Sequence, residues 1–243
     1  ALPESTALVT DDSYLTFAQL SERRDQYISF LQGNGVGVGD TVAFHGASSP
    51  DLVAGMLATM HLGAVAVPLG NTLPREYRAH IVQRCGAVLI FSDAPDMPGA
   101  IDWLPKDIAV TRFKESFRPQ KDTPFLLMFT SGSTGTPKGV LHSHRQPINR
   151  FRWMHRTYPM CEDDVCCARP TVSIMPAMWE LFGGLVVGRP TLLLSSDLIS
   201  RPDALVRSLV DHKVTRMTTT PALHHVMLTS LQNLSKSTVA SLR

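Results

Sequence analysis

Residues 127–138 read Leu-Met-Phe-Thr-Ser-Gly-Ser-Thr-Gly-Thr-Pro-Lys, and an apolar run that starts at Pro124 leads into them. Between the apolar run and the closing Pro-Lys, every residue carries a hydroxyl group or no side chain. Gly132 and Gly135 can adopt backbone angles that other residues avoid, so that consecutive amide N–H groups can point into one concavity. The segment therefore predicts a buried strand that opens into a phosphate-binding loop, with Lys138 as a positive charge beside the phosphates.

Two other interpretations of this segment are less favourable. Surface loops rich in Ser, Thr and Gly are common, but such a loop seldom follows a buried strand and ends in Pro-Lys-Gly. A Walker A loop has a different spacing, because the fifth residue after Gly132 is Pro137 rather than glycine, and Lys138 precedes Gly139 rather than Ser or Thr. The spacing disfavours a P-loop kinase.

The composition is that of an ordinary globular protein. The chain has 243 residues, of which 44% are hydrophobic and 18% charged. A formal net charge of +2 gives no signature of nucleic-acid binding. No apolar run approaches the roughly 18 residues of a membrane span, and the N-terminal residues lack the pattern of a signal peptide. We therefore expect a cytoplasmic protein with no nucleic-acid partner and no membrane span.

Apolar strands alternate with amphipathic helices along the whole chain. The predicted strands cover residues 8–10, 14–17, 41–44, 64–67, 87–91, 108–110, 124–129, 139–141, 165–168, 191–194 and 214–218. The predicted helices cover residues 16–32, 49–62, 74–84, 143–158, 178–187 and 202–212, and a further helix starts at Pro221. Many strands are apolar without alternation, and the crossovers are long. This pattern predicts an α/β fold with mixed or parallel sheets covered by helices.

The loop segment 127–138 resembles the phosphate-loop signature of the adenylate-forming, or AMP-binding, enzymes, and it meets every constrained position of that signature. This superfamily contains acyl-CoA synthetases, luciferases and the adenylation domains of nonribosomal peptide synthetases. Five other segments resemble the family in the same order along the chain. They are LTFAQL at 15–20, GVGVGD at 35–40, LGAVAVPL at 62–69, WELF at 179–182 and the segment 214–221. After LGAVAVPL, Gly70 and Asn71 replace the more usual acidic residue.

The resemblance implies a reaction in two steps. A carboxylate attacks the α-phosphate of Mg-ATP to give an acyl-adenylate and pyrophosphate, and a phosphopantetheine thiol on coenzyme A or a carrier protein then takes the acyl group. Such a reaction needs positioning and charge neutralisation more than covalent help from the protein. The resemblance assigns Lys138 as the catalytic cation. It assigns the following residues to the β- and γ-phosphates of ATP: Thr130, Ser131, Gly132, Ser133, Thr134, Gly135 and Lys138.

The resemblance also places an acyl-substrate pocket at Met175, Pro176, Trp179 and Thr218. Domains that activate amino acids usually carry an Asp three or four residues before the Trp, where this chain has Pro176 and Met175. A buried ammonium group without a carboxylate partner is costly. We therefore expect a β-amino, hydroxy, keto, aryl or plain acyl carboxylate rather than a standard α-amino acid. Core packing is an equally good interpretation of Met178 and Trp179, each taken singly.

The stretch 124–161 contains no Asp or Glu. Its basic residues are Lys138, Arg145, Arg150, Arg152 and Arg156, with His142, His144 and His155. A field of one sign would draw a polyanion such as ATP or a phosphopantetheine phosphate. The alternative is a solvated helix face whose arginines pair with acids elsewhere.

Two further candidates are weaker. The adjacent His224 and His225 point about 100° apart on a helix and lack partners at ligand spacing, so no metal site is predicted. Glu180 is either a pocket acid or the partner of an arginine.

Several motifs that the family carries beyond the segment 214–221 do not occur in this chain. They are a Tyr-Gly-x-Thr-Glu-like motif for adenine and Mg²⁺, a Thr-Gly-Asp motif for ribose, and a C-terminal lysine that drives adenylation. We therefore expect residues 1–243 to be the N-terminal part of one adenylation domain, with layered αβα subdomains that divide near residues 65–125. The C-terminal half is absent from this sequence, so the chain alone should lack full catalysis.

Alternatives from other classes stay open. One is an acyl-CoA synthetase for a fatty or aryl acid, and another is a non-catalytic module that binds a nucleotide or an acyl group. The expected partners are a small carboxylate and a carrier protein domain.

Overall fold

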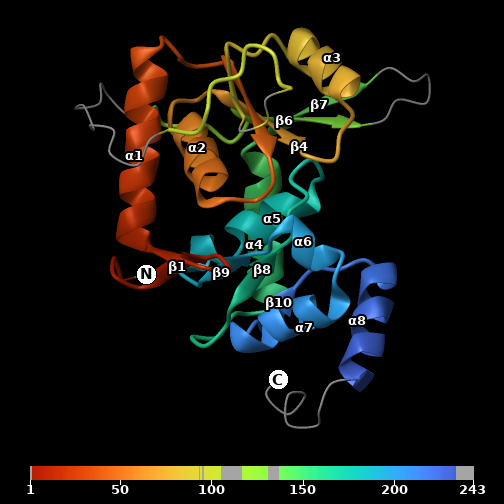
Figure 1. Cartoon of the computed structure of the whole chain (residues 1–243). Helices are drawn as coiled ribbons and strands as arrows, with labels where there is room; N and C mark the ends of the chain where they lie inside the picture. Colours follow the sequence, from red (N-terminus) through yellow and green to blue (C-terminus); the bar gives the residue numbers. More distant parts are fainter. Residues whose placement is uncertain (1, 93, 95, 105–116, 131–136, 234–243) are drawn as a thin grey trace.

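The computed structural model describes residues 2–92, 94, 96–104, 117–130 and 137–233. In this part of the chain the strands form two five-stranded sheets, with orders β5-β3-β4-β6-β7 and β10-β8-β9-β1-β2 (Figure 1). The strands are β1 (Thr6–Val9), β2 (Tyr14–Thr16), β3 (Thr41–Gly46), β4 (Val65–Gly70), β5 (Leu89–Ser92), β6 (Pro124–Thr130), β7 (Lys138–Ser143), β8 (Cys166–Ala168), β9 (Thr191–Leu193) and β10 (Arg216–Met217). Only β2 and β7, each at a sheet edge, pair antiparallel to their neighbours. The predicted mixed sheets are confirmed.

Helices separate and cover the two sheets. They are α1 (Phe17–Gly33), α2 (Pro50–His61), α3 (Arg75–Cys85), α4 (Arg145–Thr157), α5 (Pro176–Phe182), α6 (Ser196–Ile199), α7 (Pro202–Asp211) and α8 (Pro221–Asn233), with a 3₁₀ turn at Leu185–Val187. One core cluster joins both sheets to α1, α2 and α5, a second joins β3–β5 to α3, and a third joins β8 and β9 to α6, α7 and α8. The molecule is therefore a stack of helix and sheet layers (Figure 1), as the sequence predicts.

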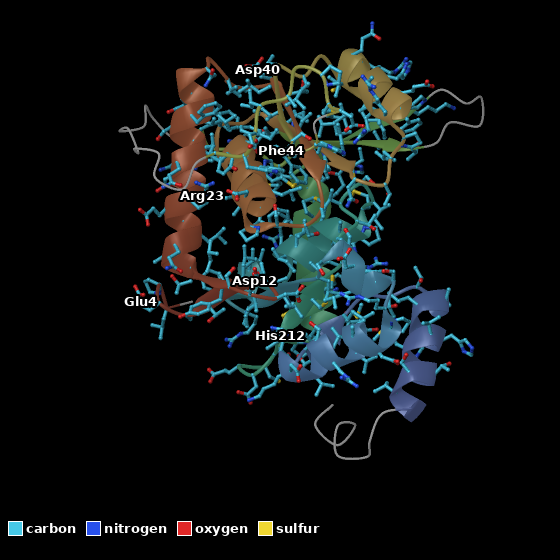
Figure 2. All side chains as sticks on the ribbon, in the orientation of Figure 1. Glu4, Asp12, Arg23, Asp40, Phe44 and His212 are labelled. Atoms are coloured by element: carbon cyan, nitrogen blue, oxygen red, sulfur yellow. The ribbon has the colours of Figure 1, made fainter. Side chains whose placement is uncertain are left out.

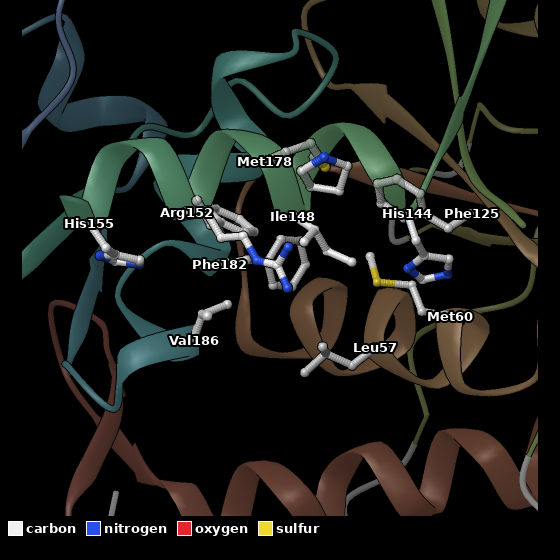
Figure 3. Close-up of a pocket in the computed structure, with 12 residues that line it drawn as sticks. Leu57, Met60, Phe125, His144, Ile148, Arg152, His155, Met178, Phe182 and Val186 are labelled. Carbon is white, nitrogen blue, oxygen red and sulfur yellow. The ribbon is translucent and has the colours of Figure 1, made fainter. Parts of the chain in front are cut away.

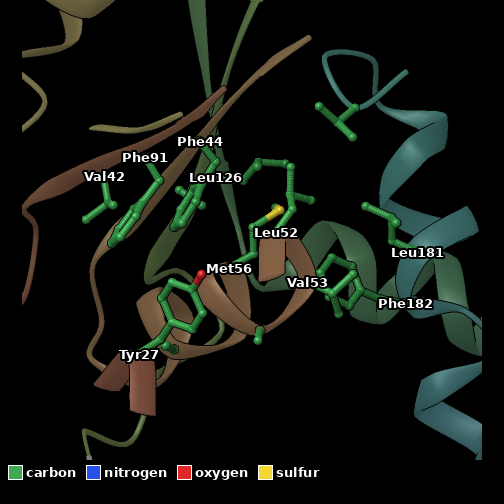
Figure 4. Close-up of a cluster of buried hydrophobic side chains, with 14 of the residues drawn as sticks. Tyr27, Val42, Phe44, Leu52, Val53, Met56, Phe91, Leu126, Leu181 and Phe182 are labelled. Carbon is green, nitrogen blue, oxygen red and sulfur yellow. The ribbon is translucent and has the colours of Figure 1, made fainter. Parts of the chain in front are cut away.

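Aromatic rings fill the core beside α2 (Figure 4). Phe44 of β3 stacks on Phe91 of β5 with ring centroids 5.5 Å apart, and Trp103 stacks against both rings. Tyr27 of α1 meets Phe91 edge-on at 5.4 Å. Such pairs add stability beyond the area that they bury. Gly55 of α2 packs directly on the Phe44 ring, where a Cβ atom would lie 2.6 Å from Cε1.

A polar contact ties α1 to α2. Arg23 (labelled in Figure 2) donates from Nε to Asp51 Oδ1 at 2.6 Å, and the Tyr27 hydroxyl lies 3.1 Å from the same oxygen. The middle of α1 is therefore joined to the first turn of α2 by polar contacts as well as by apolar packing.

The helix starts follow local signals that the sequence contains. Thr16 and Gln19 form a reciprocal capping box at the start of α1. Ser49 accepts the N–H of Leu52 at the start of α2, where Pro50 takes the first position. The turn predicted after α3 is confirmed at Gly86, which has φ 62°.

Two predicted boundaries are wrong. Pro68 does not end its strand, because β4 continues to Gly70 and Pro68 pairs with Phe44. The described pairing of β4 with β6 is at Ala66, so the missing N–H of Pro68 breaks no bond of that pair.

Ser143 does not cap a helix. It is the last residue of β7, and its hydroxyl donates to Gln146 Oε1, while α4 begins at Arg145.

The helix predicted over 178–187 is shorter and starts earlier. It spans α5 from Pro176 to Phe182 and is followed by the 3₁₀ turn. The short helix α6 was not predicted, and the strand predicted at 108–110 lies outside the described residues. Strands β3 to β7 share one sheet, and the chain passes between the two sheets at 17–40 and 144–165. Across the described helices, none has the length and apolarity to cross a membrane.

We expect Gly55→Ala to lower the free energy of unfolding by about 1–3 kcal/mol, because the new methyl group would press on the stacked Phe44 ring. Gly33→Ala is the matched control, since nothing lies within 4 Å of its Cβ position. It should be neutral or stabilising by up to about 1 kcal/mol. Urea denaturation of both variants measures the difference. Equal losses at both positions would contradict the close contact.

Candidate functional site

The hairpin β6–β7 holds the two ends of the predicted phosphate loop. Thr130 and Lys138 are directly paired across the antiparallel strands, and both are exposed. The side chains of Phe125, Leu126 and Met128 are buried, so the predicted buried strand is confirmed. Ser131, Gly132, Ser133, Thr134 and Gly135 lie outside the described residues. The structure therefore places the two anchors of the loop at the end of a packed hairpin where the loop connects its strands.

A cavity of about 730 Å³ lies beside these anchors. Its walls come from β4, α3, the hairpin and the segment 173–175, and it is called the hairpin cavity below. Thr130 and Met175 both line it, although they are far apart in the sequence. His142 also lines it, and burial lowers the pKa of this imidazole, which favours its neutral form.

Gly70 of β4 lies close to the segment 173–175. A Cβ atom on Gly70 would lie 2.8 Å from Ser173 Oγ, so a larger side chain there would require the Ser173 hydroxyl to move.

Trp179 and Thr218 line a second, smaller cavity of about 150 Å³, called the tryptophan cavity below. Its other walls come from α4, β8 and β10. Met175 and Trp179 lie about one turn apart at α5 yet line different cavities, and Pro176 lines neither of the two. The structure thus brings together Thr130 with Met175, and Trp179 with Thr218, but does not place all four in one cavity.

Glu180 is the partner of an arginine. Arg169 Nη2 lies 2.6 Å from Glu180 Oε1, and the backbone N–H of Arg169 donates to Oε2 at 3.0 Å. Both side chains are largely buried. The carbonyl of Arg169 in turn accepts the Ser48 hydroxyl at 2.6 Å. The pair fixes α5, and with it Trp179, against β8 and the segment before α2.

The arginines of α4 divide into two kinds. Arg145 makes a double hydrogen bond to Asp122 at 2.8 Å, as the paired-surface interpretation expects. Arg150 instead lies over two indole rings, with its Cζ 4.5 Å from the Trp153 centroid and 5.2 Å from that of Trp179. Among the described ion pairs, Arg145 is the one arginine of α4 that takes part.

An apolar groove of about 560 Å³ runs along α4, between it and the helices α2 and α5 (Figure 3). His144 and His155 lie at its two ends. Their Nε2 atoms are buried and have no hydrogen-bond partner among the described residues. Burial lowers the pKa of His144. The sequence did not reveal this groove, because its walls come from helices that are distant in the chain.

The histidine pair His224 and His225 is exposed on α8. Within the described ranges, no group of three or more His, Cys, Asp or Glu side chains is placed to hold a metal ion.

The family model described as "AMP-binding enzyme" matches residues 1–243, the whole chain. The chain belongs to the AMP-binding enzyme family. It is 29% identical over 238 residues to vanchrobactin synthetase VabF of Vibrio anguillarum, an alignment that covers 95% of this chain and 8% of that protein.

Solved structures give the same fold. The N-terminal subdomain of NpsA from Klebsiella oxytoca, in complex with 3-hydroxyanthranilyl-AMSN, superposes with a TM-score of 0.81 at 26% identity, over 99% of this chain and 61% of that one. NpsA-ThdA from the same organism, an artificially fused adenylation–PCP di-domain, gives 0.83 at 27% identity, over 99% and 48% of the two chains. The AMP-binding chain described here thus spans only part of each of these relatives, and the predicted fold is confirmed.

We expect Glu180→Gln to lower the free energy of unfolding by about 3–5 kcal/mol, because the buried Arg169 guanidinium would lose its counter-charge. Asp122→Asn is the matched control, since it removes the carboxylate of an exposed pair with Arg145. The control should unfold at the same denaturant concentration as the wild type. A small effect at Glu180 would show that α5 does not depend on this pair.

Proposed function

We propose that this chain is the N-terminal part of a single adenylation domain. In its parent protein the domain activates a carboxylate as an acyl-adenylate and passes the acyl group to a phosphopantetheine thiol. The observation that carries the proposal is the packed β6–β7 hairpin. It holds Thr130 and Lys138 in register at the ends of an intact loop signature, beside a cavity that Met175 also lines. Membership of the AMP-binding family supports it.

The residues of the loop act by positioning and by charge. Ser131 to Gly135 supply backbone N–H groups and hydroxyls to the β- and γ-phosphates of ATP, and Lys138 offsets their negative charge. The hairpin keeps Lys138 exposed at its loop end, where it can approach a bound polyphosphate. Mg²⁺ would accompany ATP, and the described part of the chain holds no group of three or more His, Cys, Asp or Glu side chains placed to bind the ion.

The acyl group lies along α5 in this proposal, with Met175, Pro176, Trp179 and Thr218 as its contacts. The described lining of the hairpin cavity contains no carboxylate, and Glu180, which lines the tryptophan cavity, is already paired with Arg169, so an α-ammonium group in either cavity would lack a counter-charge. The NpsA subdomain is in complex with 3-hydroxyanthranilyl-AMSN, whose acyl part is aromatic. An aryl acid or another acid without an α-ammonium group therefore fits best.

The acceptor in this proposal is a carrier-protein phosphopantetheine rather than coenzyme A. The fused adenylation–PCP di-domain supports this choice, because its adenylation part shares the fold of this chain at 27% identity. The proposed setting of the reaction is the cytoplasm.

We expect Lys138→Ala in the parent protein to lower kcat/KM for ATP by about 100-fold in an ATP–pyrophosphate exchange assay, because one preorganised charge on the phosphates is lost. Lys121→Ala is the matched control. Lys121 is exposed in the turn before β6, and its loss should leave the rate unchanged. Equal effects of the two substitutions would contradict the role of Lys138.

A panel of acids in the same exchange assay tests the substrate class. Aryl, hydroxy and keto acids should support exchange, while the standard α-amino acids should give rates near background because their ammonium group finds no carboxylate at Met175 or Pro176. Dominance of α-amino acids would overturn the substrate assignment. If none of the acids supports exchange, a non-catalytic binding module would be favoured.

A further inference from the structure

Arg150 stands at the edge of the tryptophan cavity. Its guanidinium lies over Trp153 on α4 and Trp179 on α5. Met154 follows Arg150 by four residues, so these two side chains share one face of α4, and Tyr158 comes directly after the last residue of the helix. Met154, Tyr158 and Trp179 all line the tryptophan cavity. Arg150 therefore lies beside the lining of this cavity, through its contact with Trp179.

The other charges around this cavity are compensated. Arg216 lines it and pairs with Asp164 at 3.1 Å, and Glu180 lines it and pairs with Arg169 at 2.6 Å. The described ion pairs leave Arg150 without a carboxylate. Arg150 is exposed to solvent and lies next to this cavity rather than in its lining, so its charge is available to a ligand that reaches Trp179.

The hydrogen-bonding part of Arg150 is available. Its contacts among the described residues are with the two indole rings, and the five N–H donors of a guanidinium can still reach a ligand in the plane of the group. A carboxylate or phenolic oxygen beside Trp179 can accept from these donors. An ammonium group at the same place would be repelled.

We propose that Arg150 is a specificity-determining residue for the acyl substrate. It selects carboxylic acids that carry a second oxygen acceptor, above all a second carboxylate, at the end away from the reacting carboxylate, and it discriminates against acids with an ammonium group there. This inference rests on the proposed function, since it takes the cavity at Trp179 and Thr218 as the acyl pocket. The substrate class follows from the uncompensated charge and the two aromatic faces.

The test uses the parent protein and four benzoates that differ only at position 3: benzoate, 3-hydroxybenzoate, isophthalate and 3-(aminomethyl)benzoate. In ATP–pyrophosphate exchange, kcat/KM for isophthalate should exceed that for 3-(aminomethyl)benzoate by about tenfold or more, the loss expected for one hydrogen bond to a charged group. Arg150→Gln should bring the four acids to within about twofold of each other, mainly through KM. Arg150 and Arg156 are both exposed on α4, but among the described cation–π contacts only Arg150 reaches Trp179, so Arg156→Gln should keep the wild-type ranking.

A ranking that is the same in the wild type and Arg150→Gln would overturn this inference and leave the proposed function standing. Absence of exchange with every acid would instead count against the proposed function. Binding then tests Arg150 separately, through the fluorescence of Trp153 and Trp179. Saturable quenching by isophthalate that Arg150→Gln abolishes would support the inference. Equal quenching by isophthalate and 3-(aminomethyl)benzoate would overturn it.

Discussion

The burial of α2 between the two sheets is the constraint on which the rest of the structure depends. Leu52, Val53 and Met56 are fully buried, and Gly55 lets the ring of Phe44 approach the helix backbone. A helix that is apolar on most sides is stable only when both sides are covered. Strands β3 and β4 and helix α1 contact α2, and α5 (Figure 4) and residues of the second sheet belong to the same core cluster. The layered fold follows from this requirement more than from any single strand pair.

This core places the candidate site at its margin. The β6–β7 hairpin is anchored by the buried residues of β6 and carries Thr130 and Lys138 at its loop end. The chain then passes through α4 to the second sheet, and the Arg169–Glu180 pair fixes α5 in the same layer. A reaction that depends on positioning requires its binding residues to be held by rigid elements, as they are here by the packed hairpin and by α5. The hairpin cavity and the tryptophan cavity lie at two stretches of α5 about one turn apart.

Charge is distributed unevenly between the two parts of this site. At the hairpin, Lys138 is an exposed cation suited to phosphates, and the acid-free stretch around it adds no opposing charge. Near Trp179, the buried carboxylate Glu180 is neutralised by Arg169, and the uncompensated charge is again positive, at Arg150. Both parts therefore favour negatively charged or oxygen-rich groups. An acid with an ammonium group meets no unpaired carboxylate in the described lining of either cavity, which agrees with the presence of Met175 and Pro176 where an acidic residue is expected.

The sequence by itself determined whatever depends on neighbours in the chain. The capping residues Thr16 and Ser49, the left-handed Gly86, the buried run before the loop and the loop signature are all local, and the helices and strands they predict are present. The predictions at Pro68 and Ser143 were wrong because a proline usually ends a strand and a serine often caps a helix. Here Pro68 stays in β4 through its pairing with Phe44, and the Ser143 hydroxyl donates to the side chain of Gln146. Only the tertiary structure paired Glu180 with Arg169, laid Arg150 on Trp179 and joined Thr130 to Met175 around one cavity. Most of these contacts join residues many positions apart, and their energies depend on how the layers pack, which no local pattern of residues encodes.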